Sequence, residues 1–521
     1  MILRPTTRQR RSYMDHNKPY SRLRHRIQNN YFILGILSIV WLAARTGRKP
    51  SRASYPCQQT AALNGNLWFV TYIAPIFSAL PATQPELFQK KQALAVAAVI
   101  IIAAGGGAYW FYGRTGIVTV DSATLDNGLT LSSLTATNTP SSDIFVVTKT
   151  NGADGGVDTL FKLMGSQDLK LYQSSSTGQT RGPEGLIAED DVVIIKVNCQ
   201  WDERGGTNTD LLKALIQTLI DHPDGFTGEI IVSDNGQGED RGSLNRGGSF
   251  TYPLNNALDT SQSIQDVVDS FSGNRVSTYL WSDITETRAY EFSEGNMDDG
   301  YVVEENVHLR TGLMVSYAKF TTKFGTHVSF KNGVWSVENE KYDSDLLKVI
   351  NLSMLKSHSV YGATASVKNY MGVPSDLLTG EITGEYLNTH RTIGRGGMGT
   401  LMVNTRYPVL NIIDSIWINP VPLNGPWTPY RSATQMNIIT AGTDPIALDY
   451  WSVKNILLQN WENRSGEISV SMDPDNTEDM DPGFFGNWIR LSMDEIEKAG
   501  YQVNIEQSYM NVFIAENSFN Q

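Results

Sequence analysis

Apolar and polar positions alternate along most of the chain in the way that strands and helices require. Residues 190–198, "DDVVIIKVN", form a near-continuous β-branched run typical of a strand buried on both faces. Residues 207–223 follow with leucines three and four positions apart, which predicts a helix capped by Thr207 or Thr209. Residues 228–235 have the pattern of another strand. Such units predict an α/β fold with a mostly parallel sheet flanked by helices.

The same alternation returns in the C-terminal part of the chain. A helix is predicted there with Asp444 as its cap and Pro445 in its first turn, and a later one is predicted to start at Ser492. Between the two α/β parts, at about 282–336, polar and aromatic positions alternate around Asn332-Gly333, which predicts an inserted antiparallel β region. The remaining strands are predicted at residues 346–355, 409–416, 436–442 and 510–516.

Three apolar stretches precede residue 115, near residues 31–44, 67–80 and 93–113. The last of them is free of charge over its whole length and ends in a cluster of aromatic residues, as transmembrane helices do. We therefore expect residues 1–114 to form a basic head and a membrane anchor. Residues 115–141 are rich in Ser and Thr and are expected to be a linker. A short pairing strand at "GIVTV" is the alternative for the start of that linker.

Positive charges give the expected orientation of the anchor. Residues 1–30 carry eight Lys and Arg, so the N-terminus is expected to stay in the cytoplasm. Lys90 and Lys91 precede the last span, which favours an extracytoplasmic position for the acidic domain, and three spans satisfy both conditions. If the middle stretch only lies in the membrane interface, two spans remain and the domain returns to the cytoplasm.

Charge is distributed unequally, and this excludes one class of function. Residues 1–114 hold 15 of the 42 Lys and Arg but only two of the 54 Asp and Glu. The remaining 27 basic and 52 acidic residues make residues 115–521 strongly acidic, so nucleic-acid binding is not expected. The two cysteines, Cys57 and Cys199, exclude a disulfide framework and an iron–sulfur cluster held within this chain.

Several predicted strands end in residues that carry chemistry, and ligands bind beyond the carboxyl ends of strands in open parallel sheets. The candidate ligand-binding residues, which suit a carboxylate or phosphate, are Lys196, Asn198, Lys368 and Asn369. The candidate catalytic residues, which include two histidines able to act as acid or base near neutral pH, are Lys356, His358 and His390. Three carboxylates could hold a hard divalent cation, namely Asp234, Asp414 and Asp444. Asp444 also has an ordinary explanation as a helix cap.

Five sequence blocks together resemble the DUF362 family, a domain of unknown function: "VVIIKVNCQW" followed by "TNTD", "INLSMLKSHSVYGATASVKNYMG", His390, "VLNIID" and "GTDPIALD". Their order and spacing agree with the family over most of residues 140–460, so residues 142–521 are expected to be a DUF362-like domain. The block "RKPSRASYPCQQ" is similar to membrane-anchored members. The resemblance implies an α/β fold and supplies no established reaction. Some relatives carry ferredoxin-like clusters, but the cysteines for them are absent here, so that role is not carried over.

Two functions remain open at this point. The first is an enzyme on a small anionic substrate, in which lysines hold the anion and His358 or His390 moves a proton. The second is a non-catalytic, membrane-tethered module that binds an anionic ligand, a metal or a partner. Residues 394–399, "GRGGMG", match a nucleotide-binding motif only formally, because no clear strand precedes them and "TLMVN" after them looks extended. Residues 473–482 are expected to be a solvated acidic loop.

Overall fold

The computed structural model describes residues 116–121, 141–237, 248–379, 389–477 and 483–517. The predicted basic head and the three apolar stretches before residue 115 lie outside these ranges. Among the described residues, no helix combines the length and the apolar character that a membrane crossing requires.

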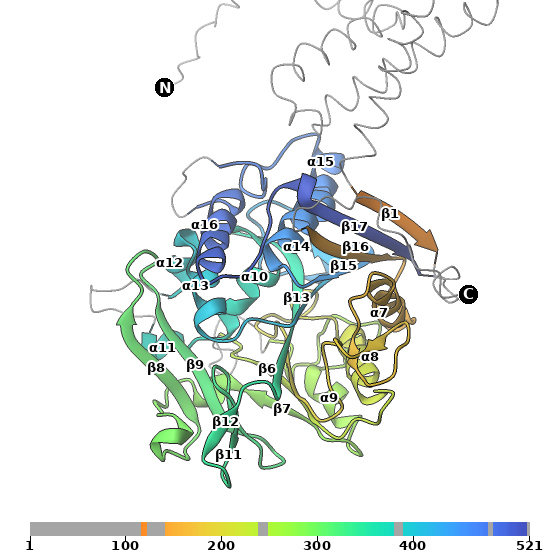
Figure 1. The fold of residues 1–521 in the computed structure, drawn as a ribbon. Coiled ribbons are helices and arrows are strands. Elements are labelled where there is room, and N and C mark those ends of the chain that lie inside the picture. The colour runs from red at the N-terminus through yellow and green to blue at the C-terminus, as the bar shows by residue number, and fades with distance from the viewer. Residues whose placement is uncertain (1–115, 122–140, 238–247, 380–388, 478–482, 518–521) are drawn as a thin grey trace, which may run out of the picture. The chain divides into compact units, whose positions relative to one another are not determined.

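One sheet of ten strands runs through the domain (Figure 1). The strand order is β1-β17-β2-β16-β15-β13-β5-β6-β7, with β14 paired to the end of β13. Neighbours along this order are parallel except at β16, which is antiparallel to both β2 and β15. The sheet is therefore mixed but mostly parallel, as predicted. The bounds are β1 Gly116–Asp121, β2 Ser142–Thr148, β5 Val192–Lys196, β6 Glu229–Asp234, β7 Val276–Leu280, β13 Leu347–His358, β14 Gly362–Thr364, β15 Leu410–Asn419, β16 Thr434–Gly442 and β17 Met510–Glu516.

The strands are apolar on both faces because each face packs against its own core. In β5, Val192 and Ile194 belong to one hydrophobic cluster, whereas Val193 and Ile195 belong to the other. This division follows from the pleat, which directs successive side chains to opposite faces. A continuous β-branched run in the sequence is therefore what a sheet covered on both faces requires.

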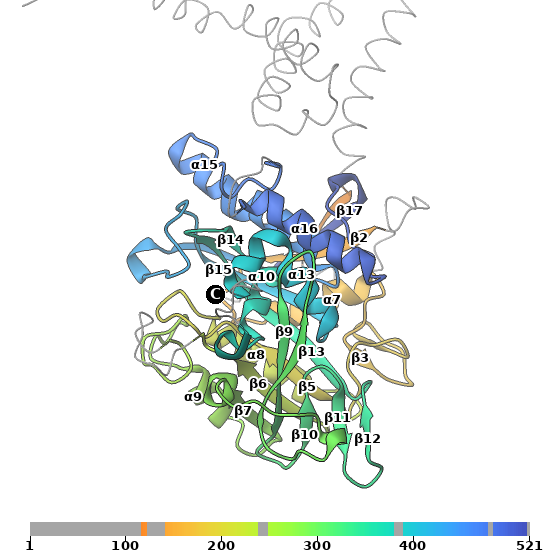
Figure 2. The same cartoon turned by 90° about the vertical axis from the view of Figure 1, so that its left-hand side faces the viewer.

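Helices cover both faces of the sheet. Helices α7 (Gly156–Ser166), α8 (Thr209–Ile220) and α9 (Ile264–Asp269) contribute their apolar residues to one cluster. Helices α13 (Gly397–Asn404), α14 (Pro445–Ser452) and α16 (Phe485–Lys498) contribute theirs to the other (Figure 2). The shorter helices are α10 Ser366–Asn369, α11 Asp376–Thr379, α12 Thr389–Thr392 and α15 Gln459–Ser465, and a small separate sheet pairs β3 Tyr172–Gln173 with β4 Arg181–Gly182.

The predicted antiparallel insertion is present as a five-stranded sheet of order β12-β11-β10-β9-β8. Strands β10, β11 and β12 lie at the lower end of the domain in Figures 1 and 2. The turn between β8 and β9 contacts α13 and α16, through Thr311 with Thr400 and Arg310 with Asp494. Asn332-Gly333 forms the turn between β10 and β11, and Gly333 has the positive φ of 107° that favours glycine there. The strands are β8 Gly300–Val307, β9 Met314–Thr321, β10 His327–Ser329, β11 Gly333–Ser336 and β12 Lys341–Asp343.

Several local expectations were wrong. The cap of α8 is Asn208, whose side chain accepts from the backbone N–H groups of the two residues after Thr209, so neither threonine caps it. Ser492 lies inside α16, which already begins at Phe485. The segment after the "GRGGMG" motif is helix α13 and not an extended strand. Two glycines of the motif allow close packing, because a Cβ at Gly396 or Gly399 would overlap the backbone of α16.

The start of the predicted linker is a strand. Residues 116–121 form β1, which pairs in parallel with β17 over six residues. The alternative of a short pairing strand at "GIVTV" is thus confirmed, and residues 122–140 lie outside the described ranges.

Arg406 fastens the antiparallel sheet to the main sheet. Its guanidinium donates hydrogen bonds of 3.0 Å to the backbone carbonyls of Phe330, Lys331, Ser344 and Leu347. These carbonyls flank β11, β12 and the start of β13, so one side chain fixes three chain segments. A lysine has neither the forked geometry nor enough donors to replace it.

We therefore expect Arg406→Lys to lower the free energy of unfolding by about 2–4 kcal/mol, because buried carbonyls lose their donors. Urea denaturation followed by circular dichroism measures this change. Arg431→Lys on the exposed surface is the matched control and should change stability by less than about 0.5 kcal/mol. Equal stability of the two variants would contradict the fastening role of Arg406.

Candidate functional site

A cavity opens at the carboxyl edge of strands β5, β6 and β13. Its empty space, including the part open to solvent, measures about 320 Å³, of which about 20 Å³ can hold the centre of a water molecule, so the cavity has room for about one water. Six predicted site residues line it. The lining consists of Lys196, Asn198, Gln200, Trp201, Asp234, Gln237, Lys356, Thr364, Lys368, Asn369, Met371, Gly372 and Pro426.

Lys196 and Asp234 form a buried ion pair at the ends of the adjacent strands β5 and β6. The Lys196 Nζ lies 2.7 Å from the Asp234 Oδ1 and also donates to the Val197 carbonyl at 2.9 Å. The second Asp234 oxygen accepts from the backbone N–H of Cys199 at 2.9 Å. Gly372 lies against this pair so closely that a Cβ there would overlap both charged groups. Position 372, the last residue of "YMG", therefore requires glycine.

Lys356 is held at the end of β13 by uncharged oxygens. Its Nζ donates to the Asn198 Oδ1 at 3.2 Å and to the carbonyl of Gly205. The side chain is 1% exposed. Burial lowers its pKa well below the usual value, and the charge of Lys368 lowers it further, while Asp234 and Asp414 act in the opposite direction.

A chain of four asparagines continues from Lys356 across the sheet. The Asn198 Nδ2 donates to the Asn369 Oδ1 at 3.0 Å, and the Asn369 Nδ2 donates to the Asn351 Oδ1 at 2.8 Å. Asn351 in turn donates to the Asn411 Oδ1 at 2.9 Å. These bonds use most of the amide groups of Asn198 and Asn369, so the two residues position Lys356 and have little donor capacity left for a ligand.

Lys368 differs from the other two lysines. It is 6% exposed, yet it makes no hydrogen bond or ion pair with any residue that the structure describes. The Tyr361 ring, 6.0 Å from its Nζ, is the aromatic face next to it. Burial and, to a smaller extent, the charge of Lys196 lower the pKa of Lys368, and Asp376 partly opposes them, so that the pKa is about 7.

Asp449 holds the backbone that carries Lys368 and Asn369. Its Oδ1 accepts from the N–H and the hydroxyl of Ser366, and its Oδ2 accepts from the Val367 N–H at 2.9 Å. A carboxylate from α14 thus caps the first turn of α10. Asp449 lies in the middle of α14, which begins at Pro445. Burial raises the pKa of Asp449 to about 7.

His358 and His390 lie next to each other, with ring centres 6.1 Å apart. The His358 Nδ1 accepts from the backbone N–H groups of Val360 and Tyr361 at 3.0 and 3.1 Å, so a neutral His358 carries its proton on Nε2. Burial and then the charge of Lys368 lower the pKa of both rings, that of His390 to about 3. The structure therefore brings both predicted histidines within electrostatic reach of Lys368, although neither lines the cavity.

The three carboxylates predicted as metal ligands are not brought together. Asp414 lies within β15 and accepts from the backbone N–H of Asn208 at 2.9 Å and of Ile416 at 3.0 Å. Asp444 caps α14 and also accepts from Ser142 and from the Asn504 N–H. Because β16 is antiparallel to β15, its end at Gly442 pairs with the start of β15, so Asp444 lies at the opposite edge of the sheet from Lys356.

Metal ligation gains no support from this placement. Among the residues that the structure describes, no three His, Cys, Asp or Glu side chains form a group suited to a metal ion. Asp234, the one predicted metal ligand in the cavity, faces lysines that would repel a cation.

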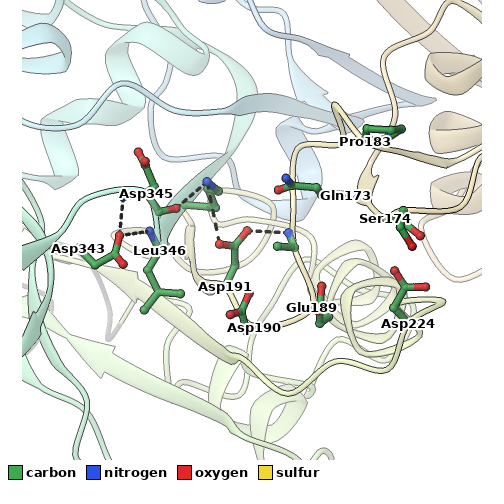
Figure 3. A pocket seen from close by; sticks show the side chains of 13 residues that line it. Gln173, Ser174, Pro183, Glu189, Asp190, Asp191, Asp224, Asp343, Asp345 and Leu346 are labelled. Atoms are coloured by element: carbon green, nitrogen blue, oxygen red, sulfur yellow. Dashed lines mark hydrogen bonds and ion pairs between the residues drawn. The ribbon is translucent and has the colours of Figure 1, made fainter.

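A larger hollow of about 620 Å³ lies at the other end of β5 and β13 (Figure 3). Its lining includes Glu189, Asp190, Asp191, Asp224, Asp343 and Asp345, with Lys348 as the one basic residue among those lining it. Two of these carboxylates stabilise the nearby backbone: Asp343 accepts a hydrogen bond from the Leu346 N–H, and Asp191 accepts one from the Ala188 N–H. This acidic hollow contains none of the predicted site residues and would repel an anion, so the smaller cavity remains the candidate site.

Sequence reasoning missed three residues that shape the cavity: Asn351, Gly372 and Asp449. Asn351 could have been found, because an asparagine inside the apolar run "LLKVINLSML" must bury an amide that needs partners. Asp449 could not, since nothing local in the sequence shows that one helix will cap another.

The fold and the site define a mixed α/β domain with a lysine-lined cavity at the carboxyl edge of its sheet. Residues 312–454 match the family model described as "Domain of unknown function (DUF362)", which confirms the resemblance found in the sequence. No curated protein and no solved structure matches the chain. The matched segment contains Lys356 and Lys368, whereas Lys196, Asn198 and Asp234 come from residues before it.

We expect Gly372→Ala to separate Lys196 from Asp234, because the added methyl group would overlap both. The free energy of unfolding should fall by about 2–4 kcal/mol, since a buried charge loses its partner. Chemical denaturation measures this. Gly273→Ala is the control, because a Cβ there meets no atom within 4 Å. A Gly372→Ala protein as stable as this control would show that the pair is not tightly packed.

Lys368→Met should stabilise the protein, and more so at low pH. The pKa of Lys368 is about 7 in the folded protein and near 10.5 in the unfolded chain. Between pH 7 and pH 10.5, Lys368 is therefore protonated in the unfolded chain but largely neutral in the folded protein. As a result, the free energy of unfolding of the wild type rises as the pH rises from 7 to 10.5. Below pH 7 the folded protein buries an unpaired ammonium, and removing it should add a few kcal/mol.

Thermal unfolding at pH 6 and pH 10 tests this expectation. The stabilisation by Lys368→Met should be large at pH 6 and small at pH 10. Lys213→Met on the exposed face of α8 is the control and should show no such difference. A gain that is equal at both pH values would mean that Lys368 is not buried as an unpaired amine.

Proposed function

We propose that the lysine-lined cavity binds a small anion, a carboxylate or a phosphate group. The observation that carries this proposal is the charge balance of the site. Lys196, Lys356 and Lys368 line one cavity and are at most 6% exposed, while Asp234 is the one carboxylate among the lining residues. Clustering amines away from water is unfavourable unless an anion compensates them.

The lysines connect binding to proton uptake. Burial and the other lysines lower the pKa of Lys356 and Lys368, that of Lys368 to about 7, so Lys368 loses its proton near neutral pH when no anion is bound. A bound anion favours the ammonium form and raises both values again. The proposed site therefore takes up protons as it binds, and its affinity falls as the pH rises above 7.

The size of the cavity limits the ligand. Because the cavity has room for about one water, an anionic group enters it only by replacing that water. The rest of a ligand would occupy the part of the cavity that is open to solvent. This favours a small molecule with one anionic end.

The proposal includes acid–base chemistry at the same site. A neutral His358 has its Nε2–H free of the backbone contacts that occupy its Nδ1. His390 is uncharged near neutral pH, and Lys368 changes its charge there. Such groups suit proton transfer.

In cellular terms, we propose a domain tethered to a membrane by its apolar N-terminal region, with the acidic domain on the extracytoplasmic side.

A non-catalytic binding module is the second candidate, and one observation favours it. The two backbone N–H groups that bond to the His358 Nδ1 stabilise the turn between β13 and β14. Stabilisation of this turn already explains why a histidine is present at position 358, without a catalytic role. The two candidates share the anion site and differ in whether the bound molecule reacts.

Titration calorimetry with sulfate and acetate tests anion binding, because neither probe changes its charge between pH 6 and pH 9. Affinity should be about 10- to 100-fold higher at pH 6 than at pH 9, and the heat should depend on the buffer because protons are taken up. Lys356→Met should weaken binding at least about tenfold, whereas Lys213→Met should not. Binding that is absent at both pH values, or independent of pH, would refute the proposal.

A further inference from the structure

Only one of the three lysine amines in the cavity is available to react. The Lys196 Nζ is paired with Asp234, and the Lys356 Nζ donates to Asn198 and to a backbone carbonyl. The Lys368 Nζ has no hydrogen bond or ion pair among the described residues, although its side chain is buried and lines the cavity. Binding of an anion by Lys356 and Lys196 leaves Lys368 beside the bound molecule.

We propose that Lys368 is a nucleophile that forms an imine with the carbonyl carbon of a small 2-oxo carboxylate bound in this cavity. The inference rests on the proposed anion site and adds the class of molecule that it takes. In a 2-oxo acid the carbonyl carbon is bonded directly to the carboxylate carbon. An acid held by one lysine therefore presents its carbonyl group to a second lysine that lines the same cavity.

The environment of Lys368 suits this role. An amine attacks a carbonyl only in its neutral form, and a desolvated lysine next to another cationic group is the arrangement that favours this form. Lys368 is buried, and Lys196 is the neighbouring charge that acts most strongly on it. At neutral pH a large fraction of Lys368 is therefore uncharged, whereas an exposed lysine is almost entirely protonated.

Imine formation balances without any oxidant or metal. The Lys368 nitrogen forms a bond to the carbonyl carbon, and the carbonyl oxygen takes a proton to give a carbinolamine. The carbon–oxygen bond then breaks, and the oxygen leaves as water with both hydrogens that the amine had carried. The product is a C=N bond between Lys368 and the acid.

The protons in these steps are assigned to Asp376, which acts electrostatically on Lys368 without a direct hydrogen bond to it, so the transfer passes through water. Its Oδ1 is buried without a hydrogen-bond partner, and its charge acts on Lys368. Burial raises its pKa to about 6, so it can both give and accept a proton near neutral pH. The other titratable groups that act on the lysine cluster are Lys196, Lys356, His358 and His390.

Reductive trapping tests the proposal on the full chain. The protein is incubated at pH 7 with pyruvate or glyoxylate and sodium cyanoborohydride, digested, and mapped by mass spectrometry. We expect a reduced adduct on Lys368 at a rate at least about tenfold above that of any other lysine. Lactate has the same carboxylate without a carbonyl, so it should slow the labelling by competition and give no adduct itself.

Three outcomes are distinguishable. Selective labelling of Lys368 in the wild type, and its loss in Lys368→Met, supports the proposal; mapping of the wild type alone decides the site if that variant does not fold. If calorimetry shows that pyruvate and lactate bind but no adduct forms on Lys368, imine formation is refuted and the anion site stands. If neither acid nor sulfate binds, the anion site fails and this inference fails with it.

Discussion

The removal of three lysine amines from water is the constraint on which the site depends. Each amine loses hydration on burial, and a folded chain tolerates this only where partners or a lowered pKa compensate. Lys196 has a carboxylate and Lys356 has neutral oxygens, whereas Lys368 has neither among the residues that the structure describes. The loss of hydration is thus compensated differently for each of the three amines. For this reason the three lysines differ in chemistry although they line the same cavity.

Uncharged groups form most of the frame around these lysines. Asn198, Asn351, Asn369 and Asn411 connect β5, β13, α10 and β15 through amide hydrogen bonds. Amides fix positions without fixing the charge of Lys356, as a carboxylate partner would. Asp449, the carboxylate that orients α10, bonds to backbone N–H groups and is not among the residues that line the cavity. The frame therefore holds Lys356 in position without a carboxylate that would keep its amine charged.

The sequence predicted the α/β class, most strands and the cluster of Lys356, His358, Lys368 and Asn369, because periodicity and strand ends are local properties of the chain. It could not predict the direction of β16, which depends on long-range pairing. Because β16 is antiparallel to β15, Asp444 lies at the opposite edge of the sheet and is not part of the site. The cap at Asp449 was missed for the same reason, since α10 and α14 are far apart in sequence.

The position of β17 has a consequence for the order in which the domain assembles. β17 lies between β1 and β2, the first two described strands of the sheet, and is synthesised after every other described strand. Until it is made, β1 has no neighbour and one edge of β2 is open. Such long-range parallel pairings form slowly and leave edges that can pair wrongly. A nascent chain therefore keeps this side of the sheet unfinished until residues 510–516 have been translated.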